Sequence, residues 1–195
     1  MTITDFLRKK FKKVLISLSS FFLKAGLTPN SITLLGLLGN IVAALFISKG
    51  KFLMGGIIAS IAGTFDAIDG TMARLSGESS KFGCLLDSLI DRYSEMTLLL
   101  GILVYFSSKN NSTGIILVYL ALCGSFLVSY IRARAGGLGV EVKKGILTRV
   151  ERLIILILSL FFNQPLIGVL IIALLGNFTA LQRLWFVQTY FKENQ

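Results

Sequence analysis

Residues 66–91 of the chain read DAIDGTMARLSGESSKFGCLLDSLID. The whole chain has only ten acidic residues, of which five are aspartates, and four of those five aspartates stand in this stretch: Asp66, Asp69, Asp87 and Asp91. The sequence on both sides is apolar, and the chain is 54% hydrophobic with a mean hydropathy of +0.77. Because ionisable groups are costly inside membrane helices, carboxylates in this setting indicate a functional site.

Apolar runs flank this stretch and recur along the rest of the chain. Their lengths approach or exceed the roughly 20 residues that a helix needs to cross a ~30 Å hydrocarbon core. They lack the alternation of barrel strands, so the sequence predicts an all-α integral membrane protein. Turn-forming residues separate six expected transmembrane helices, at about 31–48, 53–75, 83–107, 113–134, 147–162 and 165–189.

Residues 1–24 precede the first expected span and have a different pattern. Basic side chains between Arg8 and Lys13 are interleaved with Phe, Leu and Val, which predicts an amphipathic helix on an anionic membrane surface. We therefore divide the chain into this juxtamembrane helix and a six-span domain over residues 25–195. No short apolar core with a small-residue cleavage site follows the basic N-terminus, so we expect no cleaved signal peptide.

The basic residues predict how the chain is oriented in the membrane. An even number of spans places both termini on one side, and that side holds every one of the 20 Lys and Arg residues except Lys49, Lys51 and Lys109. By the positive-inside rule this is the cytoplasmic side of the cell membrane, where the expected site also opens. The net charge of +10 then faces lipid headgroups and phosphorylated metabolites, so we expect no nucleic-acid partner.

The spacing of the aspartates predicts one shared site. Asp66 and Asp69 are three residues apart and share a face of the second expected span. Asp87 and Asp91 are four apart and share a face of the third. The short connection makes these spans antiparallel, and at ~1.5 Å per residue both pairs lie roughly 10–15 Å from it. The four carboxylates therefore meet at one level.

Carboxylates this close repel one another unless cations lie among them. The chain has no histidine, and Cys84 and Cys123 stand far apart in apolar sequence, so the ligands are oxygens. Oxygen ligands favour Mg²⁺ or Mn²⁺, and two such ions would hold a diphosphate and stabilise both oxygens of a displacement. The alternative is that the aspartates are helix-end carboxylates paired with Arg74, Lys81 and Arg92.

The fixed residues of 66–91 resemble the signature of the CDP-alcohol phosphatidyltransferases. That signature is D, two residues, DG, two residues, AR, eight residues, G, three residues, D, three residues, D, and the spacing here matches it throughout. The resemblance implies an enzyme that transfers a phosphatidyl-type group from CDP-diacylglycerol or CDP-archaeol to an alcohol and releases CMP. It also implies a homodimer.

The resemblance implies roles for individual residues. Asp66, Asp69 and Asp87 would ligate the metal ions. Asp91 would complete the second metal site and act as the base that deprotonates the acceptor hydroxyl. The residues implied to bind the CDP-lipid are Asn30, Thr33, Asp69, Gly70, Ala73, Arg74 and Gly83.

Arginines at the cytoplasmic ends of the last three spans indicate the acceptor; they are Arg132, Arg134, Arg149, Arg152 and Arg183. The positive-inside bias explains some of them, but arginine is also the residue that holds phosphate bidentately. The segments at 132–135 and 148–152 resemble the family branch that makes phosphatidylinositol phosphate or archaetidylinositol phosphate. The implied acceptor is therefore inositol 1-phosphate, bound by these arginines, with glycerol 3-phosphate as the alternative.

A cation transporter is the alternative from another functional class. It predicts acidic groups near the bilayer midplane in several spans, whereas the aspartates here cluster toward one face. A non-catalytic scaffold has no need of four buried aspartates. We therefore expect a metal-dependent enzyme of phospholipid biosynthesis.

Overall fold

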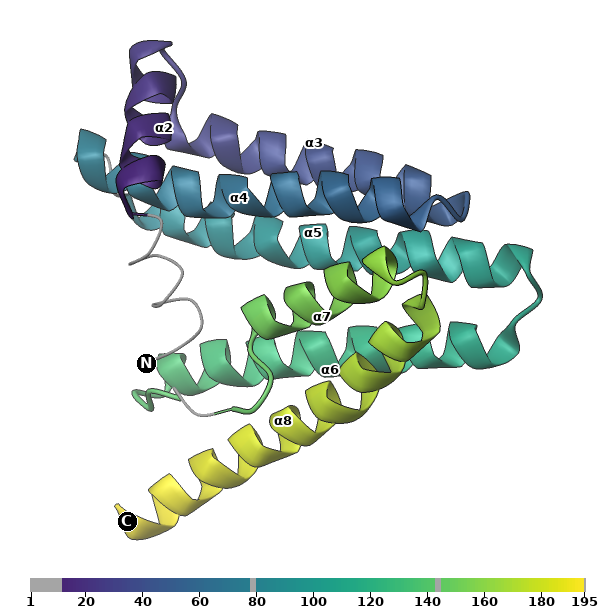
Figure 1. Cartoon of the computed structure of the whole chain (residues 1–195). Helices are drawn as coiled ribbons and strands as arrows, with labels where there is room; N and C mark the ends of the chain where they lie inside the picture. The colour runs from purple at the N-terminus through teal and green to yellow at the C-terminus, as the bar shows by residue number, and fades with distance from the viewer. Residues whose placement is uncertain (1–11, 78–79, 143–144, 195) are drawn as a thin grey trace. The chain divides into compact units, whose positions relative to one another are not determined.

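The computed structural model describes residues 12–77, 80–142 and 145–194. These residues form α-helices and connections and contain no strand. The helices, labelled in Figure 1, are α2 (Lys12–Lys24), α3 (Pro29–Ser48), α4 (Phe52–Ser76), α5 (Lys81–Ser108), α6 (Ser112–Gly137), α7 (Arg149–Phe161) and α8 (Pro165–Glu193). The predicted all-α fold is confirmed. The first part of the predicted surface helix, residues 1–11, lies outside the described residues.

Four of these helices, α3, α4, α6 and α8, are long and apolar enough to cross a membrane. The helix α5 has 28 residues, but its first half carries four charged side chains, Lys81, Asp87, Asp91 and Arg92. The helix α7 has 13 residues, which corresponds to roughly 20 Å at ~1.5 Å per residue and is shorter than a hydrocarbon core. The lengths of α3, α4, α6 and α8, together with the outward apolar side chains described below, are those of an integral membrane protein.

Local sequence signals explain where several helices begin and end. Thr28 caps α3 by accepting a hydrogen bond from the amide of Ser31, and Pro29 follows at the first helical position. Gly77 ends α4 with a φ of 71°, a left-handed conformation that favours glycine. Thr148 and Glu151 form a capping box that starts α7, which is why this helix begins two residues after the start of the predicted span.

The chain divides into two compact units, residues 1–101 and 102–195. In the first unit α3 and α4 run side by side (Figure 1). Their close approach depends on glycine, because a Cβ added to Gly39 would lie 2.9 Å from the Cβ of Ala62. The helix α2 packs on α4 through a cluster around the buried side chains Ile68 and Met72, against which Leu15 and Phe22 of α2 lie.

In the second unit α6 and α8 pack against each other, and α7 packs on α8. A Cβ added to Gly124 would lie 2.8 Å from the backbone nitrogen of Asn177, so these two helices are almost in backbone contact. The side-chain amide of Asn177 reinforces the contact by donating to the carbonyl oxygen of Leu120 at 2.9 Å. Within an apolar bundle, such interhelical hydrogen bonds replace those that water would otherwise provide.

Large apolar side chains are exposed on the outer faces of both units. Examples are Leu45 at 57% and Ile61 at 57% in the first unit, and Leu174 at 63% and Leu181 at 66% in the second. Soluble monomers rarely expose apolar surface on this scale, whereas lipid tails solvate it. The helices therefore face hydrocarbon, and the protein is a membrane protein.

Candidate metal site and arginine cluster

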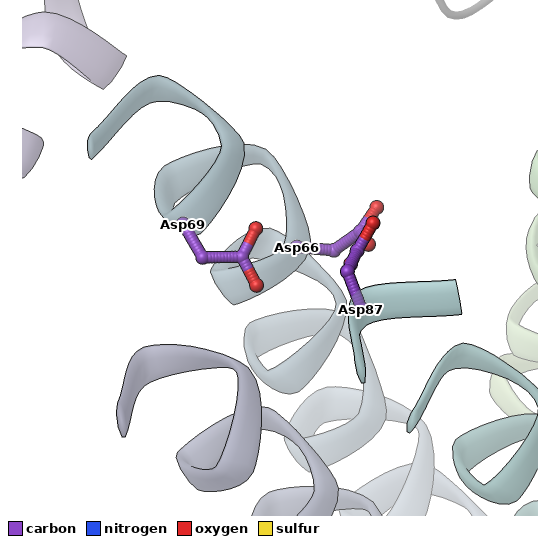
Figure 2. A group of neighbouring side chains, drawn as sticks. All are labelled: Asp66, Asp69 and Asp87. Atoms are coloured by element: carbon purple, nitrogen blue, oxygen red, sulfur yellow. The ribbon is translucent and has the colours of Figure 1, made fainter. Parts of the chain in front are cut away.

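Three aspartates come together in the first unit. Asp66 and Asp69 project from α4 and Asp87 projects from α5, and one carboxylate oxygen of each lies within 4.8 Å of those of the other two (Figure 2). Asp69 is buried, while Asp66 and Asp87 are partly exposed. In Figure 2 the carboxylates of Asp66 and Asp87 lie next to each other, and that of Asp69 points toward them from the same helix as Asp66.

This donor set fits a divalent cation. Three carboxylates at this separation carry like charges that repel, and a cation among them removes the repulsion. All the donors are oxygens, which suits Mg²⁺ or Mn²⁺. The spacing of the sequence therefore predicted correctly that aspartates from two helices meet, and three of the four expected ones do so.

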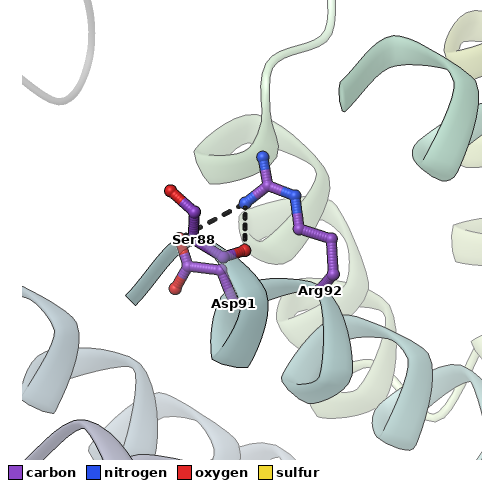
Figure 3. A network of polar contacts seen from close by, with 3 residues as sticks. All are labelled: Ser88, Asp91 and Arg92. Atoms are coloured by element: carbon purple, nitrogen blue, oxygen red, sulfur yellow. Dashed lines mark hydrogen bonds and ion pairs between the residues drawn. The ribbon is translucent and has the colours of Figure 1, made fainter. Parts of the chain in front are cut away.

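Asp91 has a different environment. It lies one helical turn beyond Asp87, outside the group of three mutually close carboxylates, and its side chain is 14% exposed. Its Oδ2 is 3.6 Å from Nη1 of Arg92, and the same nitrogen donates to the carbonyl oxygen of Ser88 at 3.0 Å (Figure 3). Arg92 thus contacts Asp91 through an interaction within α5.

Thr33 of α3 orients the most buried of the three carboxylates. Its hydroxyl donates to Oδ2 of Asp69 at 2.6 Å, and Thr33 is itself 8% exposed. A carboxylate that accepts such a bond is fixed in rotation, so one of its oxygens faces α3. Thr33, which the resemblance assigned to the CDP-lipid, is therefore hydrogen-bonded to Asp69, a predicted metal ligand.

We expect replacement of Thr33 by valine to weaken metal binding, because valine has the same shape but cannot orient Asp69. Loss of a hydrogen bond to a metal-ligating group typically lowers metal affinity about 10-fold to 100-fold. Titration of Mn²⁺ into the purified protein, followed by electron paramagnetic resonance of the free ion, measures this directly. Thr64→Val is the matched control, since the Thr64 hydroxyl is exposed and bonds only the Ile61 carbonyl of its own helix. Equal affinities for the Thr33 variant and the native protein would contradict this role.

A second contact that supports this site comes from α2 and was not predicted. The hydroxyl of Ser19, which has no exposed surface, donates to the carbonyl oxygen of Ile68 at 3.2 Å. Ile68 stands between Asp66 and Asp69, so this bond anchors the metal-binding turn of α4 to α2. A serine within an apolar helix is too common to have signalled this role from sequence.

The residues expected around the nucleotide lie near the ends of three helices. Asn30, at the start of α3, and Gly83, in the first turn of α5, are neighbours, since a Cβ on Gly83 would lie 3.5 Å from the Oδ1 of Asn30. Arg74 is exposed, and its Nη2 donates to the hydroxyl of Thr71 at 3.0 Å. Gly70 and Ala73 are partly exposed on the same turns of α4.

Arginines form a separate cluster in the second unit. Arg152 and Arg183 are 1% and 4% exposed, and the positive charges of Arg152 and of the exposed Arg132 act on Arg183. Nη1 of Arg183 donates to the carbonyl oxygen of Val128 at 2.6 Å, and Nη1 of Arg152 donates to that of Leu147 at 3.3 Å. Buried cations that repel one another are stable only with anionic or strongly polar partners, so this cluster suits a bound phosphate.

The other two predicted arginines lie at helix ends. Arg134 is exposed in the last turn of α6, and Arg149 is the partly exposed first residue of α7. The structure therefore groups Arg132, Arg152 and Arg183 and places Arg134 and Arg149 on the adjoining turns of the same helices.

These observations define a helical membrane protein with a carboxylate site for a divalent cation and a cluster of arginines. The chain belongs to the CDP-alcohol phosphatidyltransferase family, whose sequence model matches residues 26–185. It is therefore an enzyme that transfers a substituted phosphate group from a CDP-linked alcohol to an acceptor alcohol, and its cofactor is a divalent metal ion.

Particular relatives are similar over most of their length. Archaetidylinositol phosphate synthase of Pyrococcus horikoshii is 36% identical over 92% of this chain and 93% of its own. The crystal structure of Mycobacterium tuberculosis phosphatidylinositol phosphate synthase with CDP-DAG bound has a TM-score of 0.83 at 29% identity and covers 91% of this chain and 94% of that one. The same enzyme in complex with manganese and citrate gives 0.84 at 29%, over 90% and 89%.

Proposed function

We propose that the protein transfers the phosphatidyl-type group of a CDP-lipid to a hydroxyl of inositol 1-phosphate. The acceptor oxygen attacks the lipid-bearing phosphorus, the bond from this phosphorus to the CMP oxygen breaks, and CMP leaves while the acceptor proton passes to a base. The observation that carries the proposal is the group of three aspartates whose oxygens lie within 4.8 Å, in the spacing of the family signature. The relatives named above are synthases of inositol phosphate lipids, which supports the choice of acceptor.

Asp66, Asp69 and Asp87 are proposed to ligate Mg²⁺ or Mn²⁺, with Asp91 completing a second metal position. A pair of such ions neutralises a diphosphate and stabilises charge on the attacking and leaving oxygens. The residues of this chain fix where that diphosphate lies, since Thr33 and Ser19 hold Asp69 and its helical turn. Arg74, exposed beside Gly70, adds a positive charge for the same diphosphate.

Asp91 is the proposed base for the acceptor hydroxyl. It lies one turn from Asp87, so it is close to the carboxylate group but outside the mutually close set. Its Oδ2 lies 3.6 Å from Nη1 of Arg92, and the ionised carboxylate is the form that accepts a proton. Asn30, Thr33, Gly70, Ala73 and Gly83 complete the proposed surface for the CDP-lipid.

The arginine cluster is proposed to bind the phosphate of the acceptor. Arg132, Arg152 and Arg183 supply three positive charges, of which the first two act on Arg183, and Arg134 and Arg149 add to them. A free alcohol such as serine has no phosphate to justify buried cations. Glycerol 3-phosphate shares the phosphate and remains the second candidate acceptor, which the arginines alone do not distinguish from inositol 1-phosphate.

Arg183→Ala should raise the KM for inositol 1-phosphate by roughly 10-fold to 100-fold, because a hydrogen bond to a charged group is worth about 1.5–3 kcal/mol and 1.4 kcal/mol is tenfold. The KM for the CDP-lipid should change much less. Arg74→Ala is the matched comparison, and it should raise the KM for the CDP-lipid much more than the KM for inositol 1-phosphate. Steady-state CMP release at varied concentrations of each substrate measures both. An equal effect of Arg183→Ala on the two constants would contradict its role at the acceptor.

The topology is also part of the proposal. We propose six spans that include α5 and α7, a surface helix over residues 1–24 followed by the catalytic domain at 25–195, and both termini and the site on the cytoplasmic side. The concentration of Lys and Arg on that side supports the orientation. The resemblance supports a homodimer. Lys49→Cys and Lys109→Cys, each made as the single cysteine of the chain, should react with an impermeant thiol reagent from the outer side only. Labelling from the cytoplasm would contradict this topology.

An acceptor panel tests the proposed reaction. Purified protein with Mn²⁺ and either CDP-diacylglycerol or CDP-archaeol is given inositol 1-phosphate, glycerol 3-phosphate, free inositol or serine, and CMP is measured. We expect CMP with inositol 1-phosphate and little with the two free alcohols. CMP with glycerol 3-phosphate alone would move the assignment to the second candidate. No CMP with any of the acceptors would contradict the proposed function.

A further inference from the structure

The connection between α6 and α7 is held against α8. Val140 and Val142 are each 1% exposed and form a cluster against which Phe186 and Val187 of α8 pack. The amide of Leu147 donates to the hydroxyl of Thr179, a buried residue of α8, at 3.2 Å. The described parts of this connection, residues 138–142 and 145–148, are therefore anchored on the bundle by the buried residues Val140, Val142 and Leu147.

Gly145 is where this connection meets the side chain of Arg183. A Cβ added to Gly145 would lie 3.0 Å from Nε and 3.1 Å from Nη2 of Arg183, and 2.9 Å from Cγ2 of Thr179. The contact with Thr179 requires a shift and those with Arg183 are tighter than usual, so a side chain at position 145 would displace the guanidinium, the Thr179 methyl group or the connection by a few tenths of an ångström. The φ of Gly145, 156°, is also one that other residues rarely adopt.

The guanidinium has little room to yield. Its Nη1 donates to the carbonyl oxygen of Val128 in α6 at 2.6 Å, and the side chain is 4% exposed. One edge of Arg183 is thus fixed by α6 and another lies against the backbone at Gly145. Displacement from the connection side would break or bend the bond to Val128.

We propose that Gly145 is a specificity-determining positioning residue: by lacking a side chain it lets the α6–α7 connection hold the Arg183 guanidinium in the orientation that binds the acceptor phosphate. The inference rests on the proposed function, because it uses Arg183 as a ligand of that phosphate. It assigns the role to the backbone of the connection, which carries no charge and contributes no group to the reaction.

The test compares Gly145→Ala with Gly139→Ala. Gly139 belongs to the same connection and also has a positive φ, 80°, but a Cβ there would meet nothing within 4 Å. Backbone strain is therefore common to the two variants, while the clash with Arg183 belongs to one. We expect Gly145→Ala to raise the KM for inositol 1-phosphate roughly tenfold, with the CDP-lipid KM nearly unchanged, since misplacing a charged bidentate contact loses most of its energy. Gly139→Ala should change neither constant.

A double-mutant cycle shows whether the effect passes through Arg183. In the Arg183→Ala background the clashing guanidinium is gone and only the contact with Thr179 remains, so Gly145→Ala should add less than twofold to the acceptor KM. If Gly145→Ala alone fails to fold but the double variant folds, the clash is with Arg183 and the inference is supported. An additive effect in the double variant, or equal effects of Gly139→Ala and Gly145→Ala, would overturn it.

The outcomes also separate this inference from the proposed function. If Arg183→Ala raises the acceptor KM and Gly145→Ala does not, only the role of Gly145 is wrong. If Arg183→Ala leaves the acceptor KM unchanged while the CDP-lipid reaction proceeds, the arginine cluster is not the acceptor site, and the inference is overturned together with that part of the proposal.

Discussion

Replacing Asp87 by asparagine should lower the rate of CMP release by roughly 10²-fold to 10³-fold, because a metal ion contributes several kcal/mol to the transition state and each 1.36 kcal/mol is tenfold. Asp87 is the one member of the three-carboxylate group that α5 supplies. Its loss leaves the three-carboxylate group with ligands from α4 alone, so a cation in that group can no longer bridge the two helices. Asparagine keeps the shape and removes the charge.

The measurement is CMP release at increasing Mn²⁺ concentration, together with Mn²⁺ binding to the purified variant. Binding should weaken in parallel with the rate, and higher Mn²⁺ should recover part of the activity. Glu193→Gln, the same chemical change at an exposed residue at the end of α8, should alter neither quantity. Native Mn²⁺ affinity in the Asp87→Asn variant would contradict the assignment of this residue as a ligand.

Asp91→Asn should lower kcat about 10²-fold to 10⁴-fold, the range that general base catalysis contributes. An amide cannot accept the proton of the acceptor hydroxyl, whereas the three-carboxylate group that does not include Asp91 remains. We therefore expect the variant to keep the metal position of that group and to bind the CDP-lipid with an affinity close to that of the native protein, while the second metal position, which Asp91 completes, is weakened.

Arg92→Met provides the comparison for this prediction. Arg92 contacts Asp91 at 3.6 Å and is partly exposed, and such ion pairs contribute little energy, so its removal should lower kcat less than tenfold. Turnover of Asp91→Asn within threefold of the native rate, with CDP-lipid still bound, would show that another group or water takes the proton.

Hydropathy and turn residues predicted the helices closely. The span expected at 31–48 is the helix Pro29–Ser48, and that expected at 165–189 is Pro165–Glu193. The expected span at 147–162 is a helix of 13 residues, because the Thr148–Glu151 capping box and the turn at Asn163 set its ends. Hydropathy averages over a window and does not detect such local caps, so the length of α7 was overestimated.

The aspartate site was predictable because its signal is local. Residues three apart share a helix face, and the short connection after α4 brings α5 back toward it. The distinction between Asp87 and Asp91 was not predictable, since both stand on the same face and only the geometry of α5 against α4 decides which carboxylate joins the group. Of the arginines, Arg132 and Arg134 could not be separated by sequence; both are exposed, but the charge of Arg132 acts on Arg183.

Several supporting contacts had no signal in the sequence. Thr33 and Asp69 are 36 positions apart, and Ser19 and Ile68 are 49 apart. The approach of Gly145 to Arg183 likewise depends on how the α6–α7 connection packs on α8. Tertiary packing alone creates such pairs, and in each of them an ordinary small residue holds a residue of a proposed site or the helical turn that carries it.

Incorporation of labelled inositol 1-phosphate into lipid tests the central claim most directly. Inositol 1-phosphate that carries a phosphorus label is incubated with the purified protein, CDP-lipid and Mn²⁺, and the lipid is then extracted. The account predicts label in the lipid fraction in a one-to-one ratio with the CMP released, and none after chelation of the metal. CMP released without label in the lipid, or label transferred equally well in the presence of chelator, would contradict it.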